Sequence, residues 1–238
     1  MCSSDLEERR PFFQEGAGMF RCQPCQGIFY PRRIGRTPQL RANASDPLFT
    51  TILGAAKLTG RFAGGFNVGV LDAVTQRETG VGGKTVEPQT NYLVTRVSRD
   101  MRGGSSSIGI ISTVVNRSLD DDSRDYLRSD AYLAVVDGYH RFADNKYEVG
   151  GYTGRVMVTG SEEAIARTQL SSIHYHQRPD GDVAFDSTKT SMAGRGGALN
   201  VHEKKGGGGD SSFATVGSPG GGRKETRPGT LPHTKAVW

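Results

Sequence analysis

The sequence predicts an all-β fold in which consecutive antiparallel strands form a meander. Between Phe49 and Thr159, strand-length segments alternate apolar and polar residues, as the two faces of a β-strand do. Turns rich in Gly, Asp and Asn separate these segments. Glycine accounts for 33 of the 238 residues, about twice its ordinary share, and part of it lies inside the predicted strands.

The central strands are predicted over Thr50–Gly60, Phe66–Arg77, Asn91–Arg99, Ser107–Asn116, Ala131–Phe142 and Tyr147–Thr159. The alternation predicts that Ile52 shares a face of the first strand with Leu58. It also predicts that Val68 lies on the apolar face of the second strand, and that Val136 lies opposite Asp137 in the fifth.

The only predicted helix follows these strands. Ser161 can accept a hydrogen bond from a free backbone N–H, and Glu162 and Glu163 suit the first turn of a helix. Two further strands are predicted over Asp186–Ser191 and Gly194–His202.

Four segments are expected along the chain. Residues 1–6 back-translate into a common sequencing-adapter end, so we expect them to be an artefact and the natural protein to begin upstream. Residues 7–47 are expected to form an extended lead-in or plug-like segment, and residues 48–205 the antiparallel sheet. Residues 206–238 are rich in Gly, Pro and Ser without periodicity, which predicts a disordered, out-of-frame tail.

The formal net charge of +5 is carried by the two ends of the chain, because residues 48–202 contain 17 Lys and Arg against 17 Asp and Glu. A nucleic-acid-binding domain concentrates basic residues on its folded face, so no nucleic-acid partner is expected. No run of residues approaches the 18 or so apolar residues of a membrane helix.

The motifs assign no catalytic, cofactor-binding or metal-binding residue. Cys22 and Cys25 lack the second ligand pair of a zinc site and the strand-to-helix setting of a redox motif, so we interpret them as incidental. The segment Glu78–Thr85 lacks the first glycine of a phosphate loop and is expected to be a hairpin loop. His174 and His176 share one strand face without a third ligand, which favours a structural role.

Ordered motifs occur at Glu8–Ala17, Phe29–Arg36, Ile52–Arg61, Val86–Met101, Ser112–Asp121, Gly138–Phe142 and Glu162–Asp180. From about Glu8 to about Glu203 the chain thereby resembles a bacterial family of unknown function, family 5916. Full-length members carry an N-terminal module similar to family-9 carbohydrate-binding domains, followed by a domain that looks like an outer-membrane β-barrel. The resemblance implies that this chain is an internal fragment of that domain, an open, curved part of a membrane-type β-barrel.

Two charged stretches allow more than one interpretation. The arginine–aromatic clusters at Glu8–Ala17 and Phe29–Arg36 could stack on sugars or pair with acidic side chains of a barrel lumen, but a solvated linker is favoured. The acidic Arg117–Ser129 connection lacks EF-hand spacing, so a solvated loop is favoured over a calcium site. Tyr139, Phe142 and Tyr147 flank a predicted tight turn, where a barrel carries its aromatic girdle.

The functional hypothesis is a fragment of a bacterial outer-membrane β-barrel protein of unknown activity, associated with carbohydrate binding or uptake. Its expected partners are outer-membrane lipid, polysaccharide and the missing N- and C-terminal parts of the same protein, and no cofactor is expected. Val68, Val70, Val136 and Phe142 are expected to face lipid, and Asp72, Asp137 and Arg141 to be partly buried or to lie near a polar interior. Because Asp72 shares its alternation face with Val68 and Val70, it would have to lie near the membrane boundary or beside a bulge.

The alternative hypothesis is a soluble periplasmic or extracellular β-sheet module that binds carbohydrate and accompanies a glycoside hydrolase. A hydrolase itself would need two carboxylates across a cleft, and Asp72 and Asp137 are the only ones inside otherwise apolar strands. The isolated chain is expected to form an open sheet with unpaired edges, because single-chain outer-membrane barrels have about eight strands or more.

Overall fold

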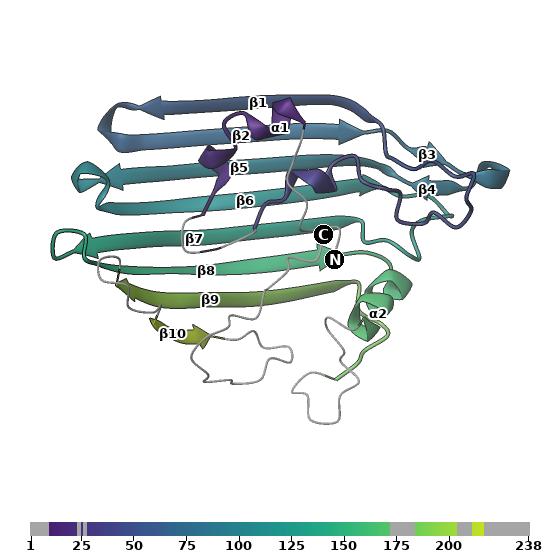
Figure 1. The fold of residues 1–238 in the computed structure, drawn as a ribbon. Coiled ribbons are helices and arrows are strands. Elements are labelled where there is room, and N and C mark those ends of the chain that lie inside the picture. The colour runs from purple at the N-terminus through teal and green to yellow at the C-terminus, as the bar shows by residue number, and fades with distance from the viewer. Residues whose placement is uncertain (1–9, 23–24, 26–27, 172–183, 204–210, 217–238) are drawn as a thin grey trace.

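The computed structural model describes residues 10–22, 25, 28–171, 184–203 and 211–216, the last stretch as backbone only. Eight strands form one sheet in the order β1-β2-β5-β6-β7-β8-β9-β10 (Figure 1). Every neighbouring pair is antiparallel, so the predicted meander is confirmed. The sheet is open, with β1 and β10 as its edge strands.

The sheet consists of β1 (Ile52–Phe62), β2 (Phe66–Thr75), β5 (Gln89–Met101), β6 (Ser106–Ser118), β7 (Asp130–Phe142), β8 (Tyr147–Thr159), β9 (Ser191–Glu203) and β10 (Ser211–Val216). A small hairpin of β3 (Glu78–Thr79) and β4 (Thr85–Glu87) occupies the segment that was expected to be a hairpin loop. The helical elements are α1 (Pro11–Gln14), α2 (Glu162–Leu170), η2 (Ala17–Phe20), η3 (Pro31–Arg33), η4 (Ala63–Gly65), η5 (Val81–Gly83) and η6 (Arg102–Gly104). Within the described residues, no helix has the length and apolar character needed to cross a membrane.

Short turns and long connections lie at opposite ends of the sheet (Figure 1). At one end, the β1–β2, β5–β6 and β7–β8 hairpins turn within a few residues. Gly65 in the first turn is required, because its φ is +81° and a Cβ there would lie 2.1 Å from the Asp100 carbonyl oxygen. The other end carries the β3–β4 hairpin, the β6–β7 connection and α2.

The predicted start of α2 is confirmed, since Ser161 Oγ accepts a hydrogen bond from the backbone N–H of Ala164 at 3.1 Å. The predicted strand at Asp186–Ser191 is wrong, and β9 instead runs unbroken from Ser191. The reason is local: Asp186 Oδ1 accepts from both the backbone N–H and the hydroxyl of Thr188, which forms a turn rather than a strand.

The strand β10 differs from the expectation that residues 206–238 contain no strand. It pairs antiparallel with β9 through backbone hydrogen bonds. Such pairing requires only the free N–H and C=O groups of an edge strand, so it forms without the apolar periodicity on which the sequence prediction depended.

A β-bulge in β1 overturns the predicted position of Ile52. Its register partner is Thr75, whereas the next paired residue, Gly54, lies opposite Val74. The extra residue between them moves Ile52 to the face opposite Leu58. There Ile52 packs against the buried core.

We call the sheet face that carries Leu71, Val94 and Ile111 the inner face. We call the described residues of 10–50 the N-terminal segment; its part from Phe13 to Ile34 lies over the inner face, and its later part runs beside the β3–β4 hairpin (Figure 1). One continuous core contains sheet residues together with residues of this segment: Phe13, Phe20, Cys22, Cys25, Ile34, Leu71, Ala73, Tyr92, Val94, Ile111, Val115, Ala131, Val135, Val158 and Ile165. The predicted solvated linker is therefore wrong for these side chains, because Ile34 is only 1% exposed.

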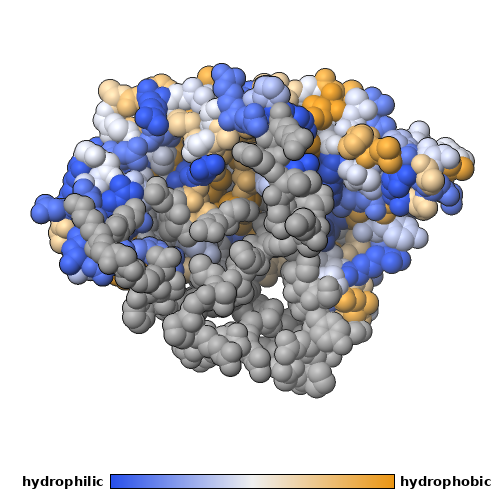
Figure 2. Space-filling view, viewed as in Figure 1, coloured by the Kyte–Doolittle hydropathy of each residue, from blue (hydrophilic) through white to orange (hydrophobic). Residues whose placement is uncertain are grey.

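Specific contacts attach the N-terminal segment to the sheet. The Phe20 ring lies against Gly69, where a Cβ would be 3.1 Å from the ring edge. Lys57 Nζ donates hydrogen bonds to the carbonyl oxygens of Phe12 and Glu15. Figure 2 shows hydrophilic and hydrophobic residues interspersed over the visible part of this side of the molecule.

The opposite face, which we call the outer face, is not covered by any described residue at its centre. Val68, Val97, Ile110 and Val136 form a continuous cross-strand row over β2, β5, β6 and β7. Large apolar side chains on this face are exposed by 40% or more, and they include Leu58, Phe62, Phe66, Val97, Ile108, Ile110, Tyr132, Val136, Phe142 and Leu199. Both faces of the strands are thus apolar, but only one is buried.

Candidate functional site

The inner face holds a buried ion pair between Arg96 on β5 and Asp137 on β7. Two nearly parallel hydrogen bonds join them, one from Nη1 to Oδ1 and one from Nη2 to Oδ2 at 2.9 Å. The Arg96 and Asp137 side chains are 5% and 4% exposed. Both carboxylate oxygens are occupied by the guanidinium, which is the strongest geometry for such a pair.

Gly109 on the intervening strand β6 makes this ion pair possible. It pairs with Ser98 on one side and Asp137 on the other, so it lies beneath the Arg96 side chain. A Cβ at Gly109 would lie 2.7 Å from Arg96 Nη2 and 2.9 Å from the Cβ of Ser98. The glycine therefore leaves the space through which Arg96 reaches across one strand to Asp137.

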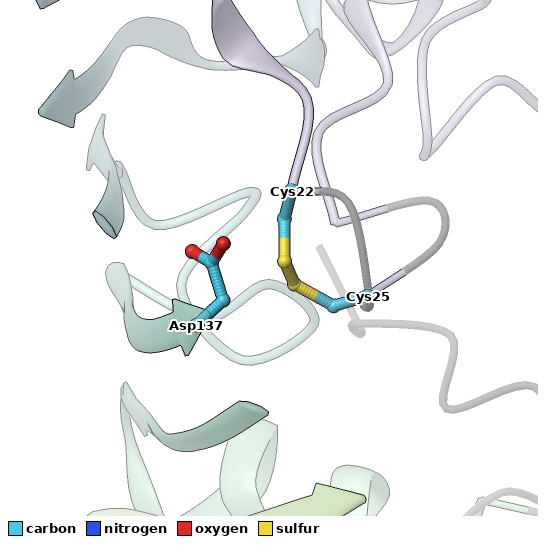
Figure 3. A group of neighbouring side chains, drawn as sticks. All are labelled: Cys22, Cys25 and Asp137. Atoms are coloured by element: carbon cyan, nitrogen blue, oxygen red, sulfur yellow. A yellow bond between two sulfur atoms is a disulfide. The ribbon is translucent and has the colours of Figure 1, made fainter. Parts of the chain in front are cut away.

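Cys22 and Cys25 form a disulfide in the N-terminal segment, next to Asp137. Figure 3 shows the Asp137 carboxylate beside the two sulfur atoms, and potential ligand atoms of the three residues lie within 4.8 Å of one another. The arrangement does not fit a metal ion, because both sulfurs are bonded to each other and both Asp137 oxygens bind the Arg96 cation. The disulfide contributes instead to the packing of the N-terminal segment on the sheet.

At the end of the inner face that carries the long connections, four arginines come together. We call them the arginine cluster: Arg33 in η3, Arg36 before β1, Arg117 near the end of β6, and Arg128 in the β6–β7 connection. Arg117 is 8% exposed, and its Nη1 donates to the carbonyl oxygen of Arg128 at 3.0 Å. Arg128 Nη1 donates to Thr168 Oγ1 at 3.4 Å, which links the cluster to α2.

The arginine cluster is poorly neutralised. Burial, followed by the positive charges of Arg117, Arg36 and Arg33, lowers the pKa of Arg128 to about 10. Burial and the neighbouring Arg36 also lower the pKa of Arg33. Among the described residues, no carboxylate forms an ion pair with any of the four guanidinium groups.

The nearest carboxylates are engaged elsewhere. Glu87 accepts from the backbone N–H of Gln39 at 2.6 Å and from its side-chain amide at 2.9 Å. Asp130 accepts from the side chains of Asn116, Ser129 and Thr159. The four cations of the cluster therefore have two neighbouring carboxylates, and both are already hydrogen-bonded to neutral groups.

The N-terminal segment positions the first two members of the arginine cluster. Arg10 donates to the carbonyl oxygens of Ile34 at 2.7 Å and Pro31 at 2.9 Å, which fixes the turn around η3. Ile34 lies between Arg33 and Arg36 in the sequence and is buried in the core, so the chain on both sides of it is held at the sheet.

A small cavity lies beside the arginine cluster. It has a volume of about 20 Å³, enough for one water molecule. Its walls include the aromatic residues Phe29, Tyr30 and Tyr92, together with Arg33 and Thr113. The hydroxyl of Thr113 is buried and forms no hydrogen bond with a described residue, but the exposed lining of the cavity is almost entirely apolar and does not offer the several polar partners that a bound water needs.

The acidic β6–β7 connection is only partly solvated, in contrast to its prediction. Asp120 binds Arg77 and the Thr85 hydroxyl, each at 2.6 Å, and also Ser123. Asp121 is 90% exposed, as a solvated loop requires. Asp120 therefore ties the connection to the β3–β4 hairpin.

The two carboxylates considered for a hydrolase lie on opposite faces of the sheet. Asp137 is buried on the inner face, whereas Asp72 lies on the outer face, where it accepts from the Asn91 side chain at 2.8 Å. They cannot flank one glycosidic bond from these positions. Asp72 is half-buried, as expected, and no bulge interrupts the register of β2, so Asp72 keeps the face of Val70 and lies close to the end of its strand.

Sequence reasoning missed the arginine cluster, although Arg33 and Arg36 belong to a stretch that it singled out. Their proposed acidic lumen partners are not found among the described residues; two further arginines occupy the neighbourhood instead. His174 and His176 lie outside the described residues. Tyr139 also departs from the predicted aromatic group, because it points to the inner face and donates to the Gly104 carbonyl oxygen at 3.2 Å, whereas the Phe142 and Tyr147 rings stack at 5.6 Å.

Residues 3–159 match the family described as "Domain of unknown function (DUF5916)". The chain belongs to this family. The match covers the N-terminal segment and the sheet through β8. Neither the curated proteins nor the solved structures contain a match to the chain. The family description assigns no activity, so functional inference depends on the geometry described above.

Proposed function

We propose that this DUF5916 chain contributes wall strands to a bacterial outer-membrane β-barrel, with residues 10–50 lying as a plug against the lumen side. The observation that carries the proposal is the uncovered apolar row of Val68, Val97, Ile110 and Val136 on the outer face. A soluble monomer rarely exposes so continuous an apolar surface, whereas hydrocarbon is its natural partner.

The dimensions of the strands support a membrane wall. Strands β5 to β9 each contain 13 residues. Such a strand is about 40 Å long and, at the usual tilt of about 35–45°, rises about 30 Å, slightly more than the apolar band of about 25 Å. Short turns at one end and long connections at the other are also typical of these barrels.

Both ends of the apolar band carry suitable side chains. At the end with the long connections, a polar row contains two amide–carboxylate pairs, Asn91 with Asp72 and Asn116 with Asp130. At the end with the short turns, Phe142 stacks on Tyr147. In membrane β-barrels, aromatic side chains lie at the membrane–water interfaces, and polar side chains begin where the apolar band ends.

The proposed lipid contact is limited to the outer face of β1 to β7. In β8 and β9, Arg155 and Arg195 are direct cross-strand partners, and both are exposed on this face. Two adjacent like charges would be costly in hydrocarbon. This pair is the observation that favours the second candidate, a soluble periplasmic or extracellular carbohydrate-binding module.

The proposed association with carbohydrate binding or uptake is supported by the resemblance to family members that carry a carbohydrate-binding module. Lipid and polysaccharide are therefore the proposed partners. Further strands of the same protein are proposed to pair with the edges of the sheet at β1 and β10, because unpaired edge groups cannot remain in hydrocarbon.

Tryptophan quenching distinguishes the two candidates. The chain has one tryptophan, so Trp238→Phe provides a silent background. In this background, we expect Ile110→Trp to be strongly quenched by lipids brominated in their acyl chains after reconstitution. The matched control, Leu199→Trp, lies on the outer face of β9 beyond the proposed band and should be quenched much less.

Equal, weak quenching of both variants would overturn the membrane proposal. If the chain were at the same time a monodisperse monomer without detergent, and Ile110→Trp were open to quenching by aqueous acrylamide, the soluble module would be the correct assignment.

A further inference from the structure

We propose that the arginine cluster is a binding site for an oxyanion group, either a carboxylate or a phosphate carried by a small molecule. The side chains of Arg33, Arg36, Arg117 and Arg128 lie close enough to influence one another electrostatically at the end of the inner face, where Arg117 is buried and the other three are half-buried. This inference depends on the cluster alone and holds for either candidate function.

The first argument is the unused hydrogen-bonding capacity. The Nε atoms of Arg36, Arg117 and Arg128 are buried, and none has a hydrogen-bond partner among the described residues. A buried donor without a partner costs about 1–3 kcal/mol, and more when it is charged. Three such donors on side chains that influence one another electrostatically indicate a shared partner that is an acceptor.

The second argument is the charge. Removing a cation from water without a counter-ion costs several kcal/mol, so buried arginines are normally paired. The same sheet shows the normal arrangement, since Arg96 is matched by Asp137 through two hydrogen bonds. The arginine cluster has no carboxylate in this role among the described residues, and Glu87 is held by Gln39.

The third argument is that the position is built by structure rather than by chance side-chain placement. Arg117 comes from the sheet and its Nη1 is fixed on the carbonyl oxygen of Arg128. Arg128 is in turn fixed on Thr168 of α2, and the turn that carries Arg33 is held by Arg10. Donors that are held in place before binding lose little conformational freedom when an anion arrives.

The geometry of arginine selects the class of ligand. Planar guanidinium groups match the two oxygens of a carboxylate or phosphate, and several around one position suit a group with two or three acceptor oxygens. Phe29, Tyr30 and Tyr92 line the adjoining cavity beside Arg33, which places aromatic surface next to the charged group of the ligand. An anionic sugar and a free phosphate share this chemistry.

Thermal unfolding of the folded chain tests the site, with inorganic phosphate and glucuronate as separate probes against sodium chloride of equal ionic strength. Phosphate or glucuronate at about one hundred times its Kd should raise the Tm by about 5–10 °C over chloride. The response to glucuronate alone, to phosphate alone or to both identifies which oxyanion the site takes.

Arg128→Met should remove most of the rise in Tm caused by the oxyanion. In chloride alone, this variant should be at least as stable as the parent chain, because one of four neighbouring, partly desolvated positive charges is gone. Loss of anion response without loss of stability separates the proposal from simple unfolding. Arg117→Met provides a second test, and Arg155→Gln, on the outer face, should leave the response unchanged.

The proposal is overturned if neither oxyanion raises the Tm above the chloride control. It is equally overturned if Arg155→Gln reduces the response as much as Arg128→Met does, because the effect would then reflect overall charge and not the arginine cluster.

Discussion

The inner and outer faces of the sheet are made by the same strands, yet they differ in every respect that matters for function. On the inner face, Leu71 and Ile111 are buried beneath the N-terminal segment, and Arg96 is matched by a carboxylate. On the outer face, Ile110 and Val136 are equally apolar but exposed. The comparison teaches that apolar alternation shows which residues share a face, whereas a covering segment decides which face becomes a core.

The largest expected effect comes from breaking the ion pair of the inner face. Asp137→Ala leaves the Arg96 cation buried without a partner and should lower the free energy of unfolding by about 3–5 kcal/mol, measured by denaturant titration. The control Asp121→Ala removes an exposed carboxylate and should cost less than about 1 kcal/mol. Replacing both partners, as Arg96→Met with Asp137→Leu, should recover most of the loss. A small effect of Asp137→Ala would show that the inner face is hydrated.

Weakening the contact between the N-terminal segment and the inner face should cause the next largest loss of stability. Ile34→Ala deletes a fully buried side chain where the N-terminal segment meets the sheet, at a cost of about 2–5 kcal/mol. The exposed outer-face residue Leu58 serves as the control, and Leu58→Ala should cost clearly less. Equal losses in the two variants would contradict the difference between the faces.

The outer face is tested by introducing a charge. If Val136 contacts hydrocarbon near the middle of a bilayer, Val136→Arg should destabilise the reconstituted protein by about 2–4 kcal/mol. The same change at Leu199, outside the proposed band, should cost much less. Unfolding titrations in lipid vesicles measure both. Should the two substitutions cost the same small amount, the outer face would not be a lipid surface.

The smallest expected effect concerns Asp46, which ties the N-terminal segment to the β3–β4 hairpin. Its carboxylate accepts from the backbone N–H groups of Asn43, Val81 and Ala42, which hold its pKa below the usual range. This contribution is present above the ordinary aspartate pKa of about 3.9 and is lost as the pH falls through the lower folded pKa.

Asp46→Asn should therefore reduce stability at neutral pH and flatten the loss of stability in acid. Unfolding titrations between pH 2 and 7, with Asp121→Asn as an exposed control, measure this dependence. An unchanged acid profile in Asp46→Asn would show that another group causes the loss.

Much of the fold could be predicted because its signals are local. The alternation at Phe66–Thr75 reflects the geometry of a single strand, and the Ser161 cap depends on residues within one helical turn. The strand predictions were wrong where a single residue changes the local structure. Examples are the bulge next to Ile52 and the turn that Asp186 forms with Thr188. Neither feature alters composition enough to be visible as a pattern.

The sequence by itself determined the antiparallel meander, its hairpins and the two sets of side chains that each strand presents, because period-two alternation and turn residues act over a few positions. Only the tertiary structure decided that the N-terminal segment covers one face. It also decided that Arg33 and Arg36 meet Arg117 and Arg128, far along the chain. Burial, and with it the uncompensated charge of the arginine cluster, depends on which surfaces pack together, which no local pattern of residues records.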